Sequence, residues 1–91
     1  MKVFLKNYEY CVPSGERIIV EVMEVDSSKY KDGIMYTFRC LSSEDKTLFA
    51  IENSHGQPHV HLRGKKTNVD YDWKAAYAKF QEMLEERLGK K

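Results

Sequence analysis

The three histidines of the chain lie close together, at positions 55, 59 and 61, within the stretch NSHGQPHVHLRGKK that covers residues 53–66. Three cationic side chains follow them in the same stretch: Arg63, Lys65 and Lys66. Histidine titrates near neutral pH, so one imidazole can hold a proton while another accepts one. Imidazoles also bind metal ions, and cationic side chains attract phosphate. These residue types therefore suit acid–base chemistry on nucleic acid, metal binding or phosphate binding.

A metal-independent ribonuclease is the interpretation that uses most of these residues. RNA cleavage needs a base for the 2′-hydroxyl, an acid for the leaving oxygen and cations that stabilise the transition state. The candidate catalytic residues are the three histidines, His55, His59 and His61. The candidate phosphate-binding residues are the cationic ones, Arg39, Arg63, Lys65 and Lys66. In this scheme His59 and His61 exchange the acid and base roles. Asn53 and Glu52 orient an imidazole through hydrogen bonds, and no cofactor is needed.

Two other classes of function remain open from the residues alone. The basic stretch also suits a non-enzymatic module that binds nucleic acid or a partner protein, since residues 53–66 contain no acidic side chain. The spacing H-x3-H-x-H would let His55, His59 and His61 surround one ion, as in a metal-dependent hydrolase with an open ligand position. Without any chemistry, the same residues would form an ordinary solvent-exposed edge strand.

The strand pattern around the histidines predicts which of them point the same way. Residues 59–62 alternate His-Val-His-Leu, so a strand there places His59 and His61 on one face, about 6–7 Å apart along the chain. Four earlier runs of strand-forming residues are separated by turn residues and cover residues 3–12, 17–25, 34–41 and 46–53. In the third of these runs, alternation places Tyr36 toward the core and Arg39 toward solvent.

The last part of the chain changes from strand to helix periodicity. A turn is expected over residues 64–68. Apolar side chains then recur every three or four residues: Trp73, Tyr77, Phe80, Leu84 and Leu88. Asp70 or Asp72 can cap the start of this helix, and Gly89 can end it. The pattern predicts an α+β fold, an antiparallel β-meander of about five or six strands with one C-terminal amphipathic helix packed on one face.

Length and composition indicate a single domain that spans residues 1–91. An apolar content of 42% is enough for one core, and 32% charged residues with a formal net charge of +1 exclude a disordered chain. Homodimer formation would help a domain of this size, which buries little surface. No apolar run approaches the ~18 residues that a membrane span needs, and the N-terminus is too polar for a secretory signal. Cys11 and Cys40 are expected as buried thiols. Together these features predict a cytoplasmic protein without a membrane partner.

Four segments in the later part of the chain form an ordered pattern. They are YTFR at residues 36–39, FAIEN at 49–53, HGQPHVH at 55–61 and VDYDWKAA at 69–76. In this order they resemble the TumE-type family, small prokaryotic proteins regarded as toxin components of type II toxin–antitoxin pairs. Glu52 stands where the family usually has Asp, and Ile51 where it often has an aromatic residue. The resemblance implies a helix-turn-helix antitoxin as partner. Through analogy with other small toxins, it favours RNA as the target.

Overall fold

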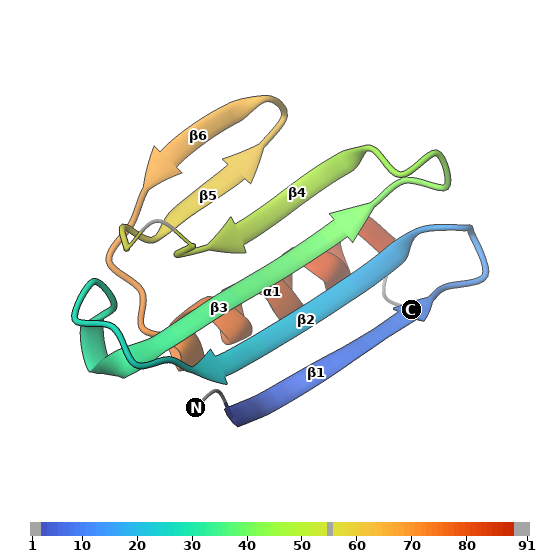
Figure 1. Ribbon diagram of the computed structural model, residues 1–91. Coiled ribbons are helices and arrows are strands. Elements are labelled where there is room, and N and C mark those ends of the chain that lie inside the picture. Colours follow the sequence, from blue (N-terminus) through green and yellow to red (C-terminus); the bar gives the residue numbers. More distant parts are fainter. Residues whose placement is uncertain (1–2, 55, 89–91) are drawn as a thin grey trace.

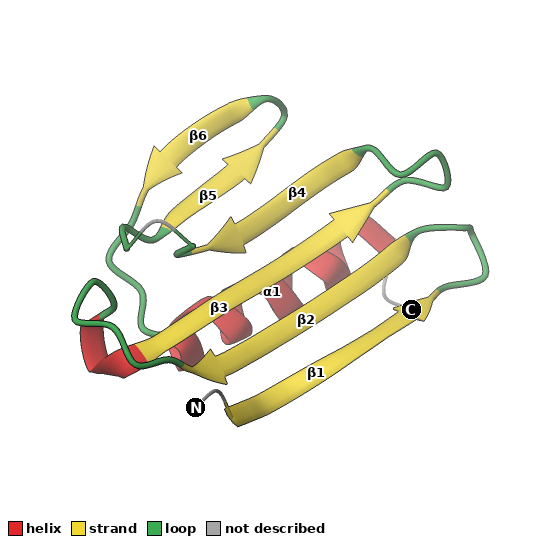
Figure 2. Ribbon diagram, in the orientation of Figure 1, coloured by secondary structure: helices red, strands yellow, loops and turns green. Residues whose placement is uncertain are grey.

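The computed structural model describes residues 3–54 and 56–88, and it confirms the predicted α+β fold. Six strands form one antiparallel sheet in which each strand lies beside the next one along the chain (Figure 1). The strands are β1 (Val3–Cys11), β2 (Arg17–Glu24), β3 (Ile34–Leu41), β4 (Thr47–Glu52), β5 (His59–Leu62) and β6 (Lys65–Asn68). The helix α1 (Trp73–Leu88) lies against one face of the sheet, and a short 3-10 helix, η1 (Lys31–Gly33), precedes β3 (Figure 2).

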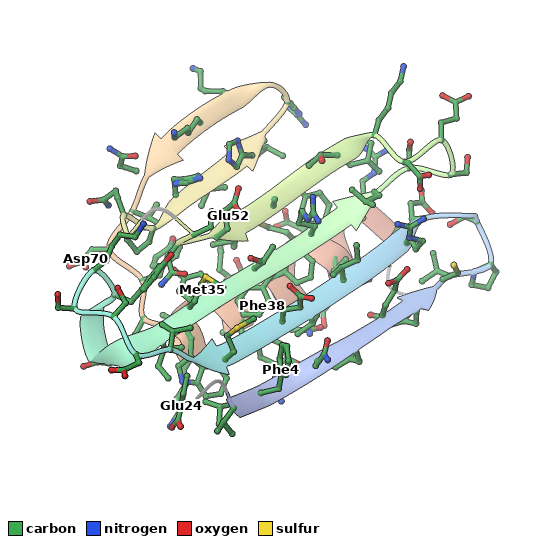
Figure 3. All side chains as sticks on the ribbon, viewed as in Figure 1. Phe4, Glu24, Met35, Phe38, Glu52 and Asp70 are labelled. Atoms are coloured by element: carbon green, nitrogen blue, oxygen red, sulfur yellow. The ribbon has the colours of Figure 1, made fainter. Side chains whose placement is uncertain are left out.

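Alternation along the strands separates a helix-facing side of the sheet from an open side. The helix-facing side chains of the sheet are mostly apolar: Ile18, Val20, Val22, Tyr36, Phe38, Cys40, Phe49 and Ile51. They pack against four buried residues of α1: Ala76, Phe80, Met83 and Leu84. Phe38, which is labelled in Figure 3, stacks on Phe80 with ring centroids 5.6 Å apart. Tyr36 is only 2% exposed, which confirms its predicted inward position.

The start of α1 also follows the sequence prediction. Asp72 acts as the cap, since its Oδ1 accepts a hydrogen bond of 2.8 Å from the backbone N–H of Ala75. The other candidate cap, Asp70, lies in the chain that leads from β6 to the helix. The predicted helix end, Gly89, lies outside the described residues. Within residues 3–54 and 56–88, no helix is both long and apolar enough to cross a membrane.

The chain after Leu62 differs from the sequence prediction. The sequence predicts a turn over residues 64–68, whereas the structure places β6 there and confines the turn to Arg63 and Gly64. Both residues have positive φ angles, 54° and 76°, as in a two-residue hairpin turn whose twist matches that of the strands. The added strand makes β5 an inner strand. The interpretation of the two histidines as part of a solvent-exposed edge is therefore wrong.

The first strand forms the other edge of the sheet and exposes apolar side chains. Phe4, labelled in Figure 3, is 49% exposed, and Val3 and Leu5 are similarly open. Cys11 at the end of β1 is exposed, so its predicted burial is wrong, whereas Cys40 on β3 is buried as predicted. The difference follows from face and position, because Cys40 belongs to the helix-facing core of an inner strand, whereas Cys11 is paired with Arg17 on the open face at the end of an edge strand.

Candidate functional site

The open side of the sheet brings several of the predicted site residues together in two rows that cross the strands. In one row, Glu52 of β4 is paired with His59 of β5. In the next row, Arg39 of β3, Ala50 of β4 and His61 of β5 are successive neighbours. Figure 3 shows Glu52 at the end of β4, beside β5. The predicted shared face of His59 and His61 is confirmed, with ring centroids 4.6 Å apart.

The carboxylate of Glu52 contacts both imidazoles through one oxygen. Its Oε2 lies 3.5 Å from Nε2 of His59 and 3.3 Å from Nε2 of His61. The other oxygen, Oε1, accepts a hydrogen bond of 3.0 Å from the hydroxyl of Ser54. Ser54 therefore fixes the carboxylate from one side, while Oε2 faces the two rings. This is the contact that the predicted orienting role of Glu52 requires.

The surroundings of Glu52 favour its ionised form. Partial burial is the largest single influence on its pKa and raises it. The hydrogen bond from Ser54 and the electrostatic influence of His59 and His61 lower it, and together they outweigh burial, so the pKa lies below its usual range. At neutral pH the carboxyl group is therefore negative and able to accept a proton or to bind a cation.

His59 is held in one orientation and in one tautomer. It is only 3% exposed, and its Nδ1 lies 2.9 Å from the backbone carbonyl oxygen of Gln57. A carbonyl oxygen can only accept, so Nδ1 carries the proton and the lone pair of the neutral ring is on Nε2, facing Glu52. A ring so deeply buried cannot reach an RNA substrate. Of these two rings, His61, with its side chain 36% exposed, is the one that reaches solvent, so the predicted exchange of acid and base roles between His59 and His61 finds no support in the burial of His59.

A groove of about 260 Å³ opens beside the Glu52–His61 contact. Ala50 lies between Arg39 and His61 in the sheet, and its small side chain leaves space between these two larger ones. The charged side chains that line the groove are those of Arg39, Glu52 and Arg63. The groove thus combines a carboxylate, an imidazole and two guanidinium groups, those of Arg39 and Arg63, which are two of the residues predicted to bind phosphate.

The lysines of β6 divide between the two faces of the sheet. Lys66 is paired with His61 and shares its open face, whereas Lys65 is paired with Leu62 and lies on the opposite face. The predicted place of Lys65 in the phosphate-binding set is therefore wrong, because residues 65–68 form a strand in which neighbouring side chains alternate. The cations that remain on the open side around the groove are Arg39, Arg63 and Lys66.

Asn53 does not orient an imidazole, contrary to the sequence prediction. It is 6% exposed, and its side-chain amide is committed to the backbone of β3. Its Oδ1 accepts a hydrogen bond of 2.7 Å from the N–H of Tyr36, and its Nδ2 donates one of 2.9 Å to the carbonyl oxygen of Ile34. The side chain continues the β3–β4 pairing beyond the end of β4, which is a structural role. The candidate catalytic residue His55 lies outside the described residues.

Three contributors to the site were not identified from the sequence. Ser54 holds the Glu52 carboxylate, the Gln57 carbonyl holds His59, and Ala50 leaves room for the groove. The side chain of Gln57 is itself anchored, since its Nε2 donates to the carbonyl oxygen of Val69 at 3.0 Å. Ser54 and Gln57 lie within the histidine stretch, but a lone hydroxyl or a backbone carbonyl leaves no pattern in a sequence.

Within residues 3–54 and 56–88, one group of donor side chains is close enough to hold a metal ion, and it includes two of the three histidines proposed from their spacing. Donor atoms of Glu52, His59 and His61 all lie within 4.8 Å of one another. Two of the three predicted ligands are therefore together, and the carboxylate supplies the third donor.

Comparisons of the chain with models of protein families, with curated proteins and with solved structures gave no significant match.

Proposed function

We propose that the protein is a toxin-type ribonuclease of the cytoplasm that cuts RNA without a metal ion in the groove beside Glu52 and His61. The observation that carries the proposal is the 3.3 Å contact between Oε2 of Glu52 and Nε2 of His61, on the wall of a groove lined by Arg39 and Arg63. A carboxylate and an imidazole in contact can act as a base and an acid in one step.

In the proposed reaction Glu52 is the base and His61 is the acid. The carboxylate takes the proton of a ribose 2′-hydroxyl, whose oxygen forms a bond to the neighbouring phosphorus. The bond from phosphorus to the 5′-oxygen breaks, and the His61 imidazolium gives that oxygen its proton. The products are a 2′,3′-cyclic phosphate and a free 5′-hydroxyl. The proton gained by Glu52 and the proton lost by His61 balance, so the site returns to its starting charge after one proton exchange.

The geometry of His61 suits this division of roles. Its Nε2 faces the carboxylate, and Nδ1 has no hydrogen-bond partner among residues 3–54 and 56–88. The imidazole ring therefore separates the donating nitrogen from the accepting carboxylate. A phosphate in the groove that reached from Oε2 of Glu52 to Nδ1 of His61 would have its entering oxygen near the carboxylate and its leaving oxygen near Nδ1, as an in-line displacement requires.

The arginines of the groove supply the charge that the transition state needs. A guanidinium group donates two parallel hydrogen bonds to a phosphate and remains charged at any working pH. Arg39 and Arg63 approach the groove from β3 and from the β5–β6 turn, so a phosphate between them would be held from two sides. Lys66, across from His61, would bind a neighbouring phosphate of the chain.

A labelled RNA of mixed sequence incubated with the protein and excess EDTA tests the proposal. We expect cleavage with 2′,3′-cyclic phosphate ends, and no cleavage of the same sequence as DNA or as 2′-O-methyl RNA. The His61→Asn variant should bind the RNA without cutting it. If the protein binds the RNA but never cuts it, the proposal is contradicted and a non-enzymatic binding module is supported instead. Cleavage that needs an added metal ion would replace the proposal with a metal-dependent hydrolase.

The partner is a separate part of the proposal. The sequence resemblance supports a helix-turn-helix antitoxin as the partner, and the exposed apolar side chains of β1 support an association, with that antitoxin or in a homodimer. Expression in a bacterial host should arrest growth, and the arrest should be lost in His61→Asn. Growth arrest of the same strength with His61→Asn would show that the toxicity does not depend on the groove.

A further inference from the structure

We propose that Glu52, His59 and His61 also form a binding site for a divalent transition metal of the zinc class, and that metal bound there stops the proton transfer described above. The binding part stands on the geometry of the three side chains alone. The inhibitory part rests on the proposed function, because it requires that Glu52 and His61 exchange protons with RNA.

Two of the three separations between the donor atoms fit a tetrahedral ion. With bonds of about 2.0–2.2 Å to nitrogen and oxygen, tetrahedral angles place ligand atoms about 3.3–3.6 Å apart. Oε2 of Glu52 lies 3.3 Å from Nε2 of His61 and 3.5 Å from Nε2 of His59. The three donor atoms all lie within 4.8 Å of one another, so side-chain movement that brings the two rings closer would complete the site. Two imidazoles and one carboxylate are also a ligand set that zinc uses.

The hydrogen bonds around the cluster orient the metal-binding atoms of His59 and Glu52. The Nδ1–H of His59 donates to the carbonyl oxygen of Gln57 at 2.9 Å, which leaves the lone pair on Nε2. Ser54 donates to Oε1 of Glu52 and leaves Oε2 for the ion. Because His59 is only 3% exposed, its ring has little freedom to lose when a metal binds. Such outer partners are typical of metal-binding imidazoles and carboxylates.

The electrostatics of the cluster call for a cation between the three groups. When His59 is neutral, the lone pair on its Nε2 faces a carboxylate oxygen 3.5 Å away, and two acceptors do not attract each other. A proton on one of the imidazoles relieves this conflict for Glu52, and a divalent ion relieves it for all three groups at once. Proton and metal therefore compete for the same atoms, so metal occupancy removes the acid and the base together.

The type of ion follows from the ligands and from the open side of the site. Imidazole nitrogens favour zinc, cobalt, nickel or copper over magnesium and calcium, which prefer oxygen ligands. His61 is 36% exposed, so a fourth position toward the groove is open to water or to an anion. The positive charges of Arg39 and Arg63 line that groove and favour an anion as the fourth ligand.

Titration of the untagged protein with Co²⁺, a coloured substitute for zinc, tests the binding part. We expect an intense visible absorption band that saturates at one equivalent and disappears when zinc is added. Glu52→Gln and His61→Asn should each weaken binding by tenfold or more, with circular dichroism showing that both variants are folded. Glu21→Gln is the matched control, since Glu21 lies in the same row of the open face, two strands from Glu52, and should leave binding unchanged. Absorption that does not saturate, or unchanged binding in both site variants, would overturn the site.

The RNA assay then tests the inhibitory part. We expect one equivalent of zinc to reduce cleavage at least tenfold and EDTA to restore it. If cleavage is unchanged or faster with bound zinc, inhibition by the metal is contradicted, but the metal site itself is not. If Co²⁺ binds as expected but no RNA is cut under any condition, the proposed function fails and the metal site stands.

Discussion

Oε2 of Glu52 lies 3.3 Å from Nε2 of His61, although the two residues are not opposite each other in the sheet. Glu52 is opposite His59, and His61 is opposite Ala50, so the contact runs diagonally from β4 to β5. Diagonal neighbours on antiparallel strands are about 7–8 Å apart between their Cα atoms, within reach of long side chains. The methyl group of Ala50 does not obstruct this diagonal, and a larger side chain there would fill the groove.

Replacing Glu52 with glutamine should lower RNA cleavage about 10²-fold or more, since an amide cannot accept the proton of the 2′-hydroxyl. The change keeps the size and shape of the side chain. Single-turnover cleavage in EDTA measures it, with Glu21→Gln as the matched control. A rate within threefold of the unchanged protein would show that Glu52 is not the base.

Arg63→Asn should stabilise the β5–β6 turn and weaken RNA binding. Arg63 adopts a φ of 54°, which asparagine accepts more readily than arginine, and Asn-Gly is a favoured pair in two-residue hairpin turns. We expect the free energy of unfolding to rise by an amount on the order of 0.5 kcal/mol. RNA affinity should fall, and the slope of log affinity against log salt should decrease by about 0.7 for one lost phosphate contact. Urea unfolding and filter binding measure the two effects. Unchanged affinity would place Arg63 outside the interface.

The two lysines of β6 provide a matched pair. Lys66→Ala should weaken RNA binding severalfold, whereas Lys65→Ala should leave it nearly unchanged, because these side chains lie on opposite faces of the sheet. Both changes remove one positive charge from an exposed strand position, so net charge cannot explain a difference. Equal losses of affinity, measured at one salt concentration, would mean that overall charge rather than the open face attracts RNA.

Asn53→Ala should reduce stability rather than chemistry. The change removes two hydrogen bonds to the backbone of β3 and leaves the N–H of Tyr36 without its partner in a buried region. The expected loss is about 2–3 kcal/mol in the free energy of unfolding, which urea denaturation measures. RNA cleavage measured well below the unfolding transition should change by less than threefold. A large loss of cleavage in folded Asn53→Ala would restore the orienting role predicted from the sequence.

The two cysteines should differ in their reactivity with iodoacetamide at pH 8. Burial raises the pKa of the Cys40 thiol to about 11, so this group stays protonated and unreactive below that pH, whereas Cys11 is exposed. Intact-mass measurement should show one modified cysteine in the native protein and two after unfolding in urea. Modification of both cysteines in the native protein would contradict the burial of β3.

The outline of the fold could be predicted from the sequence because strand and helix patterns are local. The strands at residues 34–41 and 59–62 end where alternation predicts, and the spacing of Trp73, Tyr77 and Phe80 predicts the helix that covers the sheet. The shared face of His59 and His61 follows from the same period of two. The face of Lys65 was missed because it depends on the turn: a two-residue turn at Arg63 and Gly64 starts β6 one residue after the glycine.

The α+β meander, the inward and outward sides of the first five strands and the concentration of imidazoles and cations near β5 all follow from local patterns in the sequence. The contact of Glu52 with both rings could be seen only in the folded chain, because it depends on how β4 and β5 align across the intervening residues. The tertiary structure also decided that His59 is buried and that Asn53 braces β3. Periodicity reports which face a side chain takes, whereas register between strands sets its neighbours, and register is fixed by the packing of the whole sheet.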